Sequence, residues 1–389
     1  MNITDFISAG RQFAPEFLMS CCIINGSVLR LDEVQSMGCT EFGLRSRLNM
    51  PLKLYRYYPN RWSKNEEEQD VNYSHIALKN NTVFLQSPTE FDDVYDSDIT
   101  IDFVEYEKQR LIEYCRRCQL TAEKDWTIQE LGDALTKALW QGYNKTGCLN
   151  GAFSLPAASE LELLSNQLFS SRVLVEFQKT NDFGVSVSNA IRNEYVEYCN
   201  YLKTIFRTTC FATTPYSQLM WGGAYGDCHK GFCVEYTVLP NEPKYAEVYS
   251  NLFPMVYCKV RPDMTERIVA AKDRMITEET LWDLYFHGAL RKSIDWAFQN
   301  EWRLLLPLRK SSSEDYNVPF FPITKVYLGN RMQPRQRKEI IDICKEREIP
   351  YVGVKRNPVL FEMQDCEVLC EECPRFRGDT LLRQSKESG

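Results

Sequence analysis

Apolar and polar side chains alternate in several short segments of the chain, which is the pattern of β-strands with one face in the core. Many of these segments end at proline, glycine or asparagine, as strands do before turns. The pattern predicts strands over residues 52–58, 81–88, 208–214, 231–236, 253–260, 323–328 and 350–354.

Apolar residues recur at helical spacing over about 102–207, 263–295 and 333–347. We therefore predict an α+β protein whose mixed or antiparallel sheet core carries a large α-helical insertion. The predicted organisation is an N-terminal extension over 1–50, a core domain over 51–360 that includes the insertion 102–207, and a flexible cysteine-containing tail over 361–389.

A polar stripe lies in the run Trp296–Arg303, which leads into three leucines. If this run starts a strand, Gln299, Glu301 and Arg303 share one face, and Phe298 and Trp302 point to the core. Two interpretations follow, a sheet edge with a solvated outer face or the polar floor of a site. In the second case Glu301 carries chemistry, and we interpret Arg303 as a structural ion-pair partner.

Composition narrows the class of protein. The chain has 389 residues, 44% of them hydrophobic. Its formal net charge is −7 and it has no long Lys/Arg block, so the sequence lacks the overall positive charge typical of proteins that bind duplex nucleic acid. No window of 18 apolar residues occurs, and the first residues lack a basic start followed by an apolar run. We expect a cytoplasmic protein without membrane attachment, in which most of the 15 cysteines are reduced.

Three predicted strands carry residues suited to a nucleotide. Arg56 offers a cationic fork for phosphates, Thr213 and Thr214 offer hydroxyls, and Gln299 and Glu301 come last in the chain. Arginine, then Ser/Thr, then Gln-x-Glu resembles the arginine–serine–glutamate class of ADP-ribosyltransferases. The usual Ser-x-Ser pattern is replaced by Ala212-Thr213-Thr214, and the helical block separates Arg56 from Thr213.

That resemblance implies an ADP-ribosyltransferase-like core that uses NAD as substrate to modify a macromolecule. Glu301 would be catalytic with Gln299 beside it, and Arg56, Thr213 and Thr214 would shape the NAD site. It also implies that Arg56, Thr213 and Glu301 converge in one cleft. Without that role, Arg56 pairs with a carboxylate and Thr213 simply suits a strand.

Four motifs in order carry a second resemblance: Leu54–Tyr57, Leu85–Asp96, Gln218–Cys233 and Trp296–Arg303. Together they look like a bacterial domain family of unknown function, whose members are similar to proteins of toxin and phage-defence systems. This resemblance implies a toxin or phage-defence effector, a protein or nucleic-acid acceptor, and an antitoxin or regulatory partner.

The loop from Met220 to Lys230 is rich in glycine and aromatic residues. Its glycines allow close backbone approach to a flat ligand, with Trp221 and Tyr225 available for stacking. His229 can act as acid, base or donor near neutral pH. The alternative is a glycine-relaxed loop covered by packed aromatics.

Two clusters suggest metals. Asp92, Asp93, Asp96 and Asp98 carry oxygen ligands for Mg²⁺ or Ca²⁺, and Cys366, Cys370 and Cys373 have metal-site spacing but no evident fourth ligand. Neither has a full ligand pattern, so we predict no metal. Two rival functions remain, a non-catalytic nucleotide- or partner-binding module and a metal-dependent nuclease toxin using the aspartates and His229.

Overall fold

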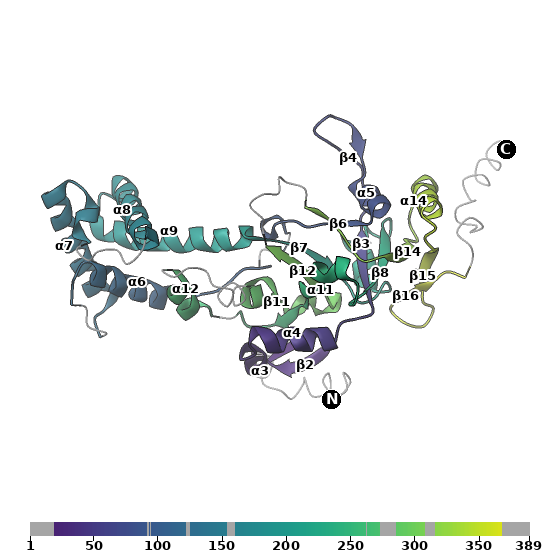
Figure 1. The fold of residues 1–389 in the computed structure, drawn as a ribbon, viewed down its shortest axis with the longest axis horizontal. Helices are drawn as coiled ribbons and strands as arrows, with labels where there is room; N and C mark the ends of the chain where they lie inside the picture. Colours follow the sequence, from purple (N-terminus) through teal and green to yellow (C-terminus); the bar gives the residue numbers. More distant parts are fainter. Residues whose placement is uncertain are drawn as a thin grey trace, which may run out of the picture. The chain divides into compact units, whose positions relative to one another are not determined.

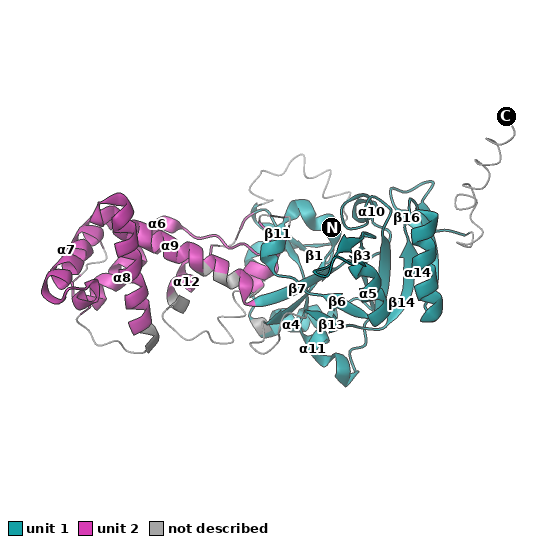
Figure 2. Cartoon of the chain, turned by 90° about the horizontal axis from the view of Figure 1, so that it is seen from above, with its two compact units in different colours: residues 1–90, 206–259, 292–389 teal, residues 91–205, 260–291 magenta. Residues whose placement is uncertain are grey.

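The computed structural model describes residues 19–367, apart from 92, 94, 122–124, 154–159, 262, 273–284 and 308–315. Within these limits the chain forms helices and mixed sheets, which confirms the α+β prediction (Figure 1). It divides into two compact units, unit 1 with residues 1–90, 206–259 and 292–389, and unit 2 with residues 91–205 and 260–291 (Figure 2).

Unit 1 contains three larger sheets. The strands of the five-stranded sheet, in spatial order, are β16 (Met363–Asp365), β15 (Tyr351–Arg356), β14 (Ile323–Leu328), β8 (Phe232–Thr237) and β3 (Lys53–Tyr58). A three-stranded sheet has β7 (Phe206–Phe211), β12 (Trp302–Pro307) and β9 (Leu252–Pro254), and a four-stranded sheet has β11 (Arg291–Ser293), β10 (Val256–Cys258), β1 (Cys21–Ile24) and β2 (Ser27–Arg30).

The described residues of unit 1 also form two-stranded sheets and α-helices. Its two-stranded sheets are β13 (Asn317–Pro319) with β6 (Thr82–Phe84), and β4 (Ser63–Lys64) with β5 (Asp70–Val71). Its α-helices are α3 (Leu31–Gln35), α4 (Cys39–Leu48), α5 (Tyr73–Asn80), α10 (Gln218–Gly222), α11 (Ala246–Ser250) and α14 (Pro334–Glu346).

The described part of the N-terminal segment, residues 19–50, belongs to this unit, since β1 pairs with β10. The sequence predicted only a weakly periodic extension there. Two other differences concern the expected helical stretch 263–295, which also contains strand β11, and the expected strand 253–260, which is divided into β9 and β10. Strands β3 and β14 lie where alternation predicted them.

The five-stranded sheet is buried on both faces. Along β3, Leu54 and Tyr58 join one hydrophobic core, in which Ile340 of α14 also packs. Tyr55 and Tyr57 point the other way into a second core that contains Trp221. The alternation of β3 therefore assigns these four side chains to two cores, one on each face.

Unit 2 is helical, as expected for the block 102–207. It contains α6 (Phe103–Arg117), α7 (Ile128–Thr146), α8 (Glu160–Thr180), α9 (Phe183–Thr204) and α12 (Thr265–Lys272), with a π-helix over Tyr285–Ala289. Asp102 caps α6, a capping box of Thr127 and Glu130 starts α7, and Asp182 caps α9. These caps satisfy the orphan N–H groups of each first turn, so they fix where the helices begin.

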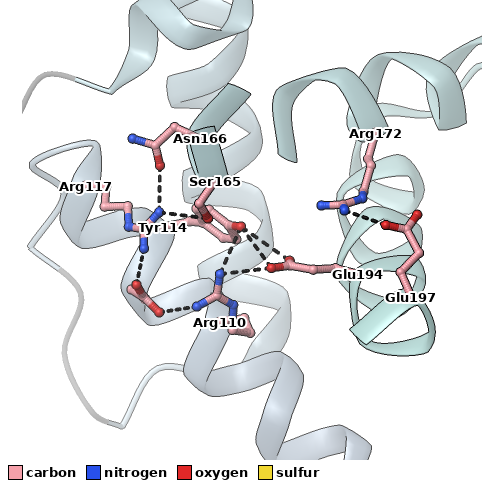
Figure 3. Close-up of polar contacts among 9 residues, drawn as sticks. Arg110, Tyr114, Arg117, Ser165, Asn166, Arg172, Glu194 and Glu197 are labelled. Carbon is pink, nitrogen blue, oxygen red and sulfur yellow. Dashed lines mark hydrogen bonds and ion pairs between the residues drawn. The ribbon is translucent and has the colours of Figure 1, made fainter. Parts of the chain in front are cut away.

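A buried charge network joins helices α6, α8 and α9 of unit 2 (Figure 3). Arg110 of α6 donates to Glu194 of α9 at 3.1 Å and pairs with Glu113, which also pairs with Arg117. Arg117 then donates to Asn166 of α8 at 2.7 Å. Each charge is compensated locally, which is the condition for burying such groups.

Candidate functional site

The segment before β12 is a turn and not the predicted start of a strand. Residues Ile294–Gln299 form a 3-10 helix, and Asn300 follows in the left-handed region with a φ of 42°. Asparagine tolerates this conformation better than most residues. Trp302 is fully buried as predicted, but Phe298 is 39% exposed, so the prediction that it points to the core is wrong. The turn still brings Gln299 and Glu301 together.

Glu301 is the centre of a buried polar cluster. Its Oε1 accepts from Nε of Arg303 at 2.9 Å and from a terminal guanidinium nitrogen at 2.8 Å, and its Oε2 lies 3.3 Å from Nζ of Lys292. Glu301, Arg303 and Lys292 are 5%, 0% and 8% exposed. The interpretation of Arg303 as an ion-pair partner is confirmed, and one carboxylate is shared by two buried cations.

Gln299 extends this cluster to the surface. Its side-chain oxygen accepts from Nζ of Lys292 at 3.0 Å, and its side-chain nitrogen donates to the hydroxyl of Tyr225 at 2.9 Å. Tyr225 is 41% exposed. Burial raises the pKa of its hydroxyl above the ordinary value, which keeps it neutral at physiological pH. A continuous chain of polar contacts thus runs from Arg303 to Tyr225.

The backbone of Glu301 is also fixed. Its N–H donates to the hydroxyl of Tyr257 at 2.8 Å, and its carbonyl accepts from the N–H of Met255 at 2.9 Å. Burial raises the pKa of Tyr257 well above the ordinary value, so this hydroxyl is a neutral partner. Met255 lies between β9 and β10 and Tyr257 lies in β10, so this segment fixes the backbone that carries the carboxylate.

Thr213 belongs to the site and Thr214 does not share its role. The hydroxyl of Thr213 accepts from the side chain of Asn300 at 2.7 Å, which ties the segment after β7 to the turn before β12. The hydroxyl of Thr214 accepts from the N–H of Tyr216 at 3.2 Å, and its carbonyl accepts from Tyr57 at 2.9 Å. Thr214 therefore shapes the loop after β7.

Arg56 is not brought together with Glu301. Its guanidinium lies 5.2 Å from the ring centre of Tyr58 and 5.9 Å from that of Phe211, and it contacts the carbonyl of Phe84 at 3.5 Å. Phe211 is the register partner of Trp302. Because Glu301 and Arg303 flank Trp302 in sequence, Arg303 and its bound carboxylate lie on the other face of that sheet. The expected convergence of Arg56 with Thr213 and Glu301 does not occur.

Trp221 is a core residue and offers no stacking surface in this structure. It is fully buried, its indole N–H donates to the carbonyl of Pro215 at 2.7 Å, and its ring meets Tyr57 edge-on at 5.2 Å. Here the alternative of packed aromatics holds. Tyr225, on the same loop, is the exposed ring.

His229 lies at the end of that loop and packs in parallel with Trp221 at 6.4 Å between ring centres. Asp227, Cys228 and His229 all have positive φ values, of 49°, 52° and 69°. Such backbone is strained for residues other than glycine. Burial, with the charge of Arg331, lowers the pKa of His229, so its ring is neutral at pH 7.

The described residues hold no group of three or more side chains placed to bind a metal ion. Asp98, the last of the acidic cluster, pairs with Arg261 at 2.6 Å and with Lys203 at 3.2 Å. Asp92, Cys370 and Cys373 lie outside the described residues, while Cys366 is a partly buried free thiol.

Lys292 is the site residue that the sequence did not suggest. It lies in β11, inside a stretch whose periodicity indicated a helix, and its ammonium also lies 5.2 Å from the ring centre of Trp296. A lysine between Arg291 and Ser293 gives no signal of burial by itself. Only the pairing of β11 at the edge of its sheet places this ammonium against Glu301.

No family model, curated protein or solved structure matches the chain. The two family resemblances therefore stay predictions. Among the described residues, no helix combines the length and apolar character needed to cross a membrane.

Proposed function

We propose that the chain is an ADP-ribosyltransferase-like enzyme that takes NAD as substrate and modifies a macromolecule, with Glu301 as the catalytic carboxylate. One observation carries the proposal. Gln299, Glu301, Tyr225 and, through Asn300, Thr213 come from three distant segments and meet in one polar cluster. This is the Ser/Thr and Gln-x-Glu part of the resemblance.

The roles follow from charge. Breaking the bond between nicotinamide and C1′ of the ribose leaves positive charge on the sugar, while nicotinamide departs with the electron pair. A carboxylate stabilises that charge until the acceptor bonds to C1′ and loses its proton. Glu301 supplies the carboxylate, and Gln299 and Tyr225 supply hydrogen bonds to ribose or nicotinamide. Asn300 and Thr213 hold the turn.

The phosphate-binding cation of this proposal is Lys292 and not Arg56. A compact ammonium suits a phosphate as a point charge. In the structure Lys292 covers one oxygen of Glu301. The diphosphate of NAD would draw this ammonium away, which uncovers the carboxylate for the ribose.

The experiment measures nicotinamide released from NAD by the purified chain, its Glu301→Gln variant and its Glu235→Gln variant, with water as the acceptor that bonds to C1′. Glu235 is the matched control, since it is 3% exposed and accepts hydrogen bonds from Lys53, Thr324 and Tyr327. Loss of a charge-stabilising group costs roughly 10²–10³-fold in rate. We expect that loss in the Glu301 variant alone, and equal rates in the two variants would overturn the role of Glu301.

A specific observation favours a second candidate, a non-catalytic nucleotide- or partner-binding module. Glu301 is only 5% exposed, and both its oxygens are paired with buried cations. In this candidate the cluster is structural, and its role is to hold the turn that presents Tyr225. The module binds NAD or another nucleotide without consuming it, so calorimetric binding together with intact NAD in the mass spectrum identifies this candidate.

A further inference from the structure

Two cysteines lie directly opposite each other on neighbouring strands of unit 1. Cys22 belongs to β1 and Cys258 is the last residue of β10, and the two are register partners in this antiparallel pair. They are 0% and 5% exposed, and both are thiols in this structure. The other strand cysteines have register partners of another kind, Arg30 for Cys21, Arg303 for Cys210, and Tyr57 and Tyr327 for Cys233.

The register places both thiols within reach of a disulfide. Directly opposed residues of an antiparallel pair point to the same face of the sheet, with Cα atoms about 4.5–5.5 Å apart, and disulfides span Cα separations of roughly 4.4–6.8 Å. Their β-carbons lie about 4.5–5.5 Å apart, so a closure of about 1 Å or less brings them to the spacing of a disulfide. Among the described residues the ladder consists of Cys22 with Cys258 and Ile23 with Tyr257. The cysteine pair is therefore at the end of a short ladder, where such a closure moves little of the chain.

We propose that Cys22 and Cys258 form a reversible disulfide when a hydroperoxide oxidises the chain, and that this bond fixes β1 to β10. The thiolate of one cysteine attacks a peroxide oxygen, the O–O bond breaks, and a sulfenic acid and water form. The second thiolate attacks the sulfenic sulfur, the S–O bond breaks, and the departing hydroxide takes up a proton. Two thiols and one hydrogen peroxide thus give one disulfide and two water molecules, and a dithiol reductant reverses the reaction.

The oxidant reaches these buried thiols when the β1–β2 hairpin opens locally. Strand β2 is the outer strand of its sheet, and three of its four residues are exposed. Elements with few buried contacts and a short ladder open at lower free energy than the core of a protein. The open hairpin exposes both thiols, and when the ladder re-forms it brings them together. The reduced pair is therefore the resting state, and an oxidising environment changes it.

The disulfide would form beside the polar cluster of Glu301. Tyr257 directly precedes Cys258, and its hydroxyl accepts from the backbone N–H of Glu301 at 2.8 Å. Strand β10 also neighbours β11, which carries Lys292. A bond that fixes β10 to β1 therefore restrains the strand from which the backbone of Glu301 is held. The bond itself does not depend on the function proposed for that cluster.

Peptide mapping by mass spectrometry tests the bond. The full chain is treated with hydrogen peroxide, its remaining thiols are alkylated, and it is digested without reduction. We expect a linked pair of peptides containing Cys22 and Cys258, lighter by two hydrogens than the reduced peptides together, which a dithiol reductant separates. Cys22→Ala and Cys258→Ala should each abolish this link. An oxidised wild-type chain in which these two cysteines stay unlinked, or link to other cysteines instead, overturns the proposal.

Two matched variants control for the position of the thiol. Cys21→Ala should keep the link, because adjacent residues of a strand point to opposite faces and Cys21 therefore faces away from Cys258. Cys233→Ala should keep it too, because Cys233 is equally buried in a strand but has tyrosines as register partners. Loss of the link in Cys21→Ala would show that Cys21 is the bonded residue and would overturn the assignment to Cys22.

Hydrogen exchange tests the effect of the bond on the strands. In the oxidised wild-type chain the amides of β1 and β10 should exchange about tenfold more slowly, or slower still, than in the reduced chain, because opening of the hairpin no longer separates the two strands. In Cys22→Ala, peroxide should leave their exchange unchanged. Equal exchange in the reduced and the oxidised, linked wild-type chain would contradict the claim that the bond fixes β1 to β10.

Discussion

Removing the charge of Glu301 tests the buried cluster most severely. In Glu301→Gln the carboxylate shared by Lys292 and Arg303 becomes a neutral amide, although the shape is kept. Arg303 is 0% exposed and Lys292 is 8% exposed, so water does not replace the lost charge. Breaking a buried ion pair by removing one partner costs about 3–5 kcal/mol. The amide oxygen still accepts one hydrogen bond, so we expect about 3 kcal/mol.

The loss is measured by native-state hydrogen exchange of the amides in β12, because a chain of two compact units need not unfold in one step. Adding Arg303→Met to Glu301→Gln removes one of the two cations that the Glu301 carboxylate contacts. The loss of unfolding free energy in the double variant should therefore be smaller than the sum of the losses in the two single variants, by about 1 kcal/mol or more. A loss below about 1 kcal/mol in Glu301→Gln would refute the burial of the cluster.

Three further predictions concern other parts of the chain. Arg56→Ala should release nicotinamide within about threefold of the wild-type rate, because Arg56 does not lie with Glu301. Removing a transition-state contact lowers the rate roughly 10²-fold or more, so a fall of that size would show that Arg56 is a ligand of NAD. Burial lowers the pKa of His287 from 6.5 to about 3, so stability from its neutral form is present above pH 6.5 and is lost as the pH falls toward 3. His287→Phe should make the free energy of unfolding less dependent on pH in that window, by up to about 1.4 kcal/mol per pH unit, and parallel pH profiles would contradict this. In Gly231→Ala the new Cβ would lie 2.2 Å from the carbonyl oxygen of Tyr58, whereas in Gly132→Ala it meets nothing within 4 Å. Thermal unfolding should show a loss of about 1–3 kcal/mol in the first variant and a small gain in the second, and equal shifts would count against the close approach.

Local patterns predicted the strands well where one strand alternates over its full length. Lys53–Tyr58 and Ile323–Leu328 form the expected strands because their alternate side chains enter a core. The helical block was also visible, because apolar residues recur at helical spacing from Phe103 to Thr204. Such periodicity depends only on neighbours in sequence.

The site depended on information that is not local. Alternation shows that Arg56 and Tyr55 face opposite ways, but only pairing with other strands decides which of the two faces the site. A left-handed turn at Asn300 stands where a strand was expected, because a short polar run has no strong preference for a strand over a turn. Lys292 reaches Glu301 through pairing of β11, which no spacing in the sequence encodes.

The most direct measurement is the amount of nicotinamide formed when NAD is incubated with the wild-type chain, with Glu301→Gln and with Glu235→Gln. The proposed function predicts more than one nicotinamide per wild-type chain, a loss of about 10²-fold or more in Glu301→Gln, and retained turnover in Glu235→Gln. NAD that remains intact with the wild-type chain would contradict the transferase and leave the binding module as the function of this site.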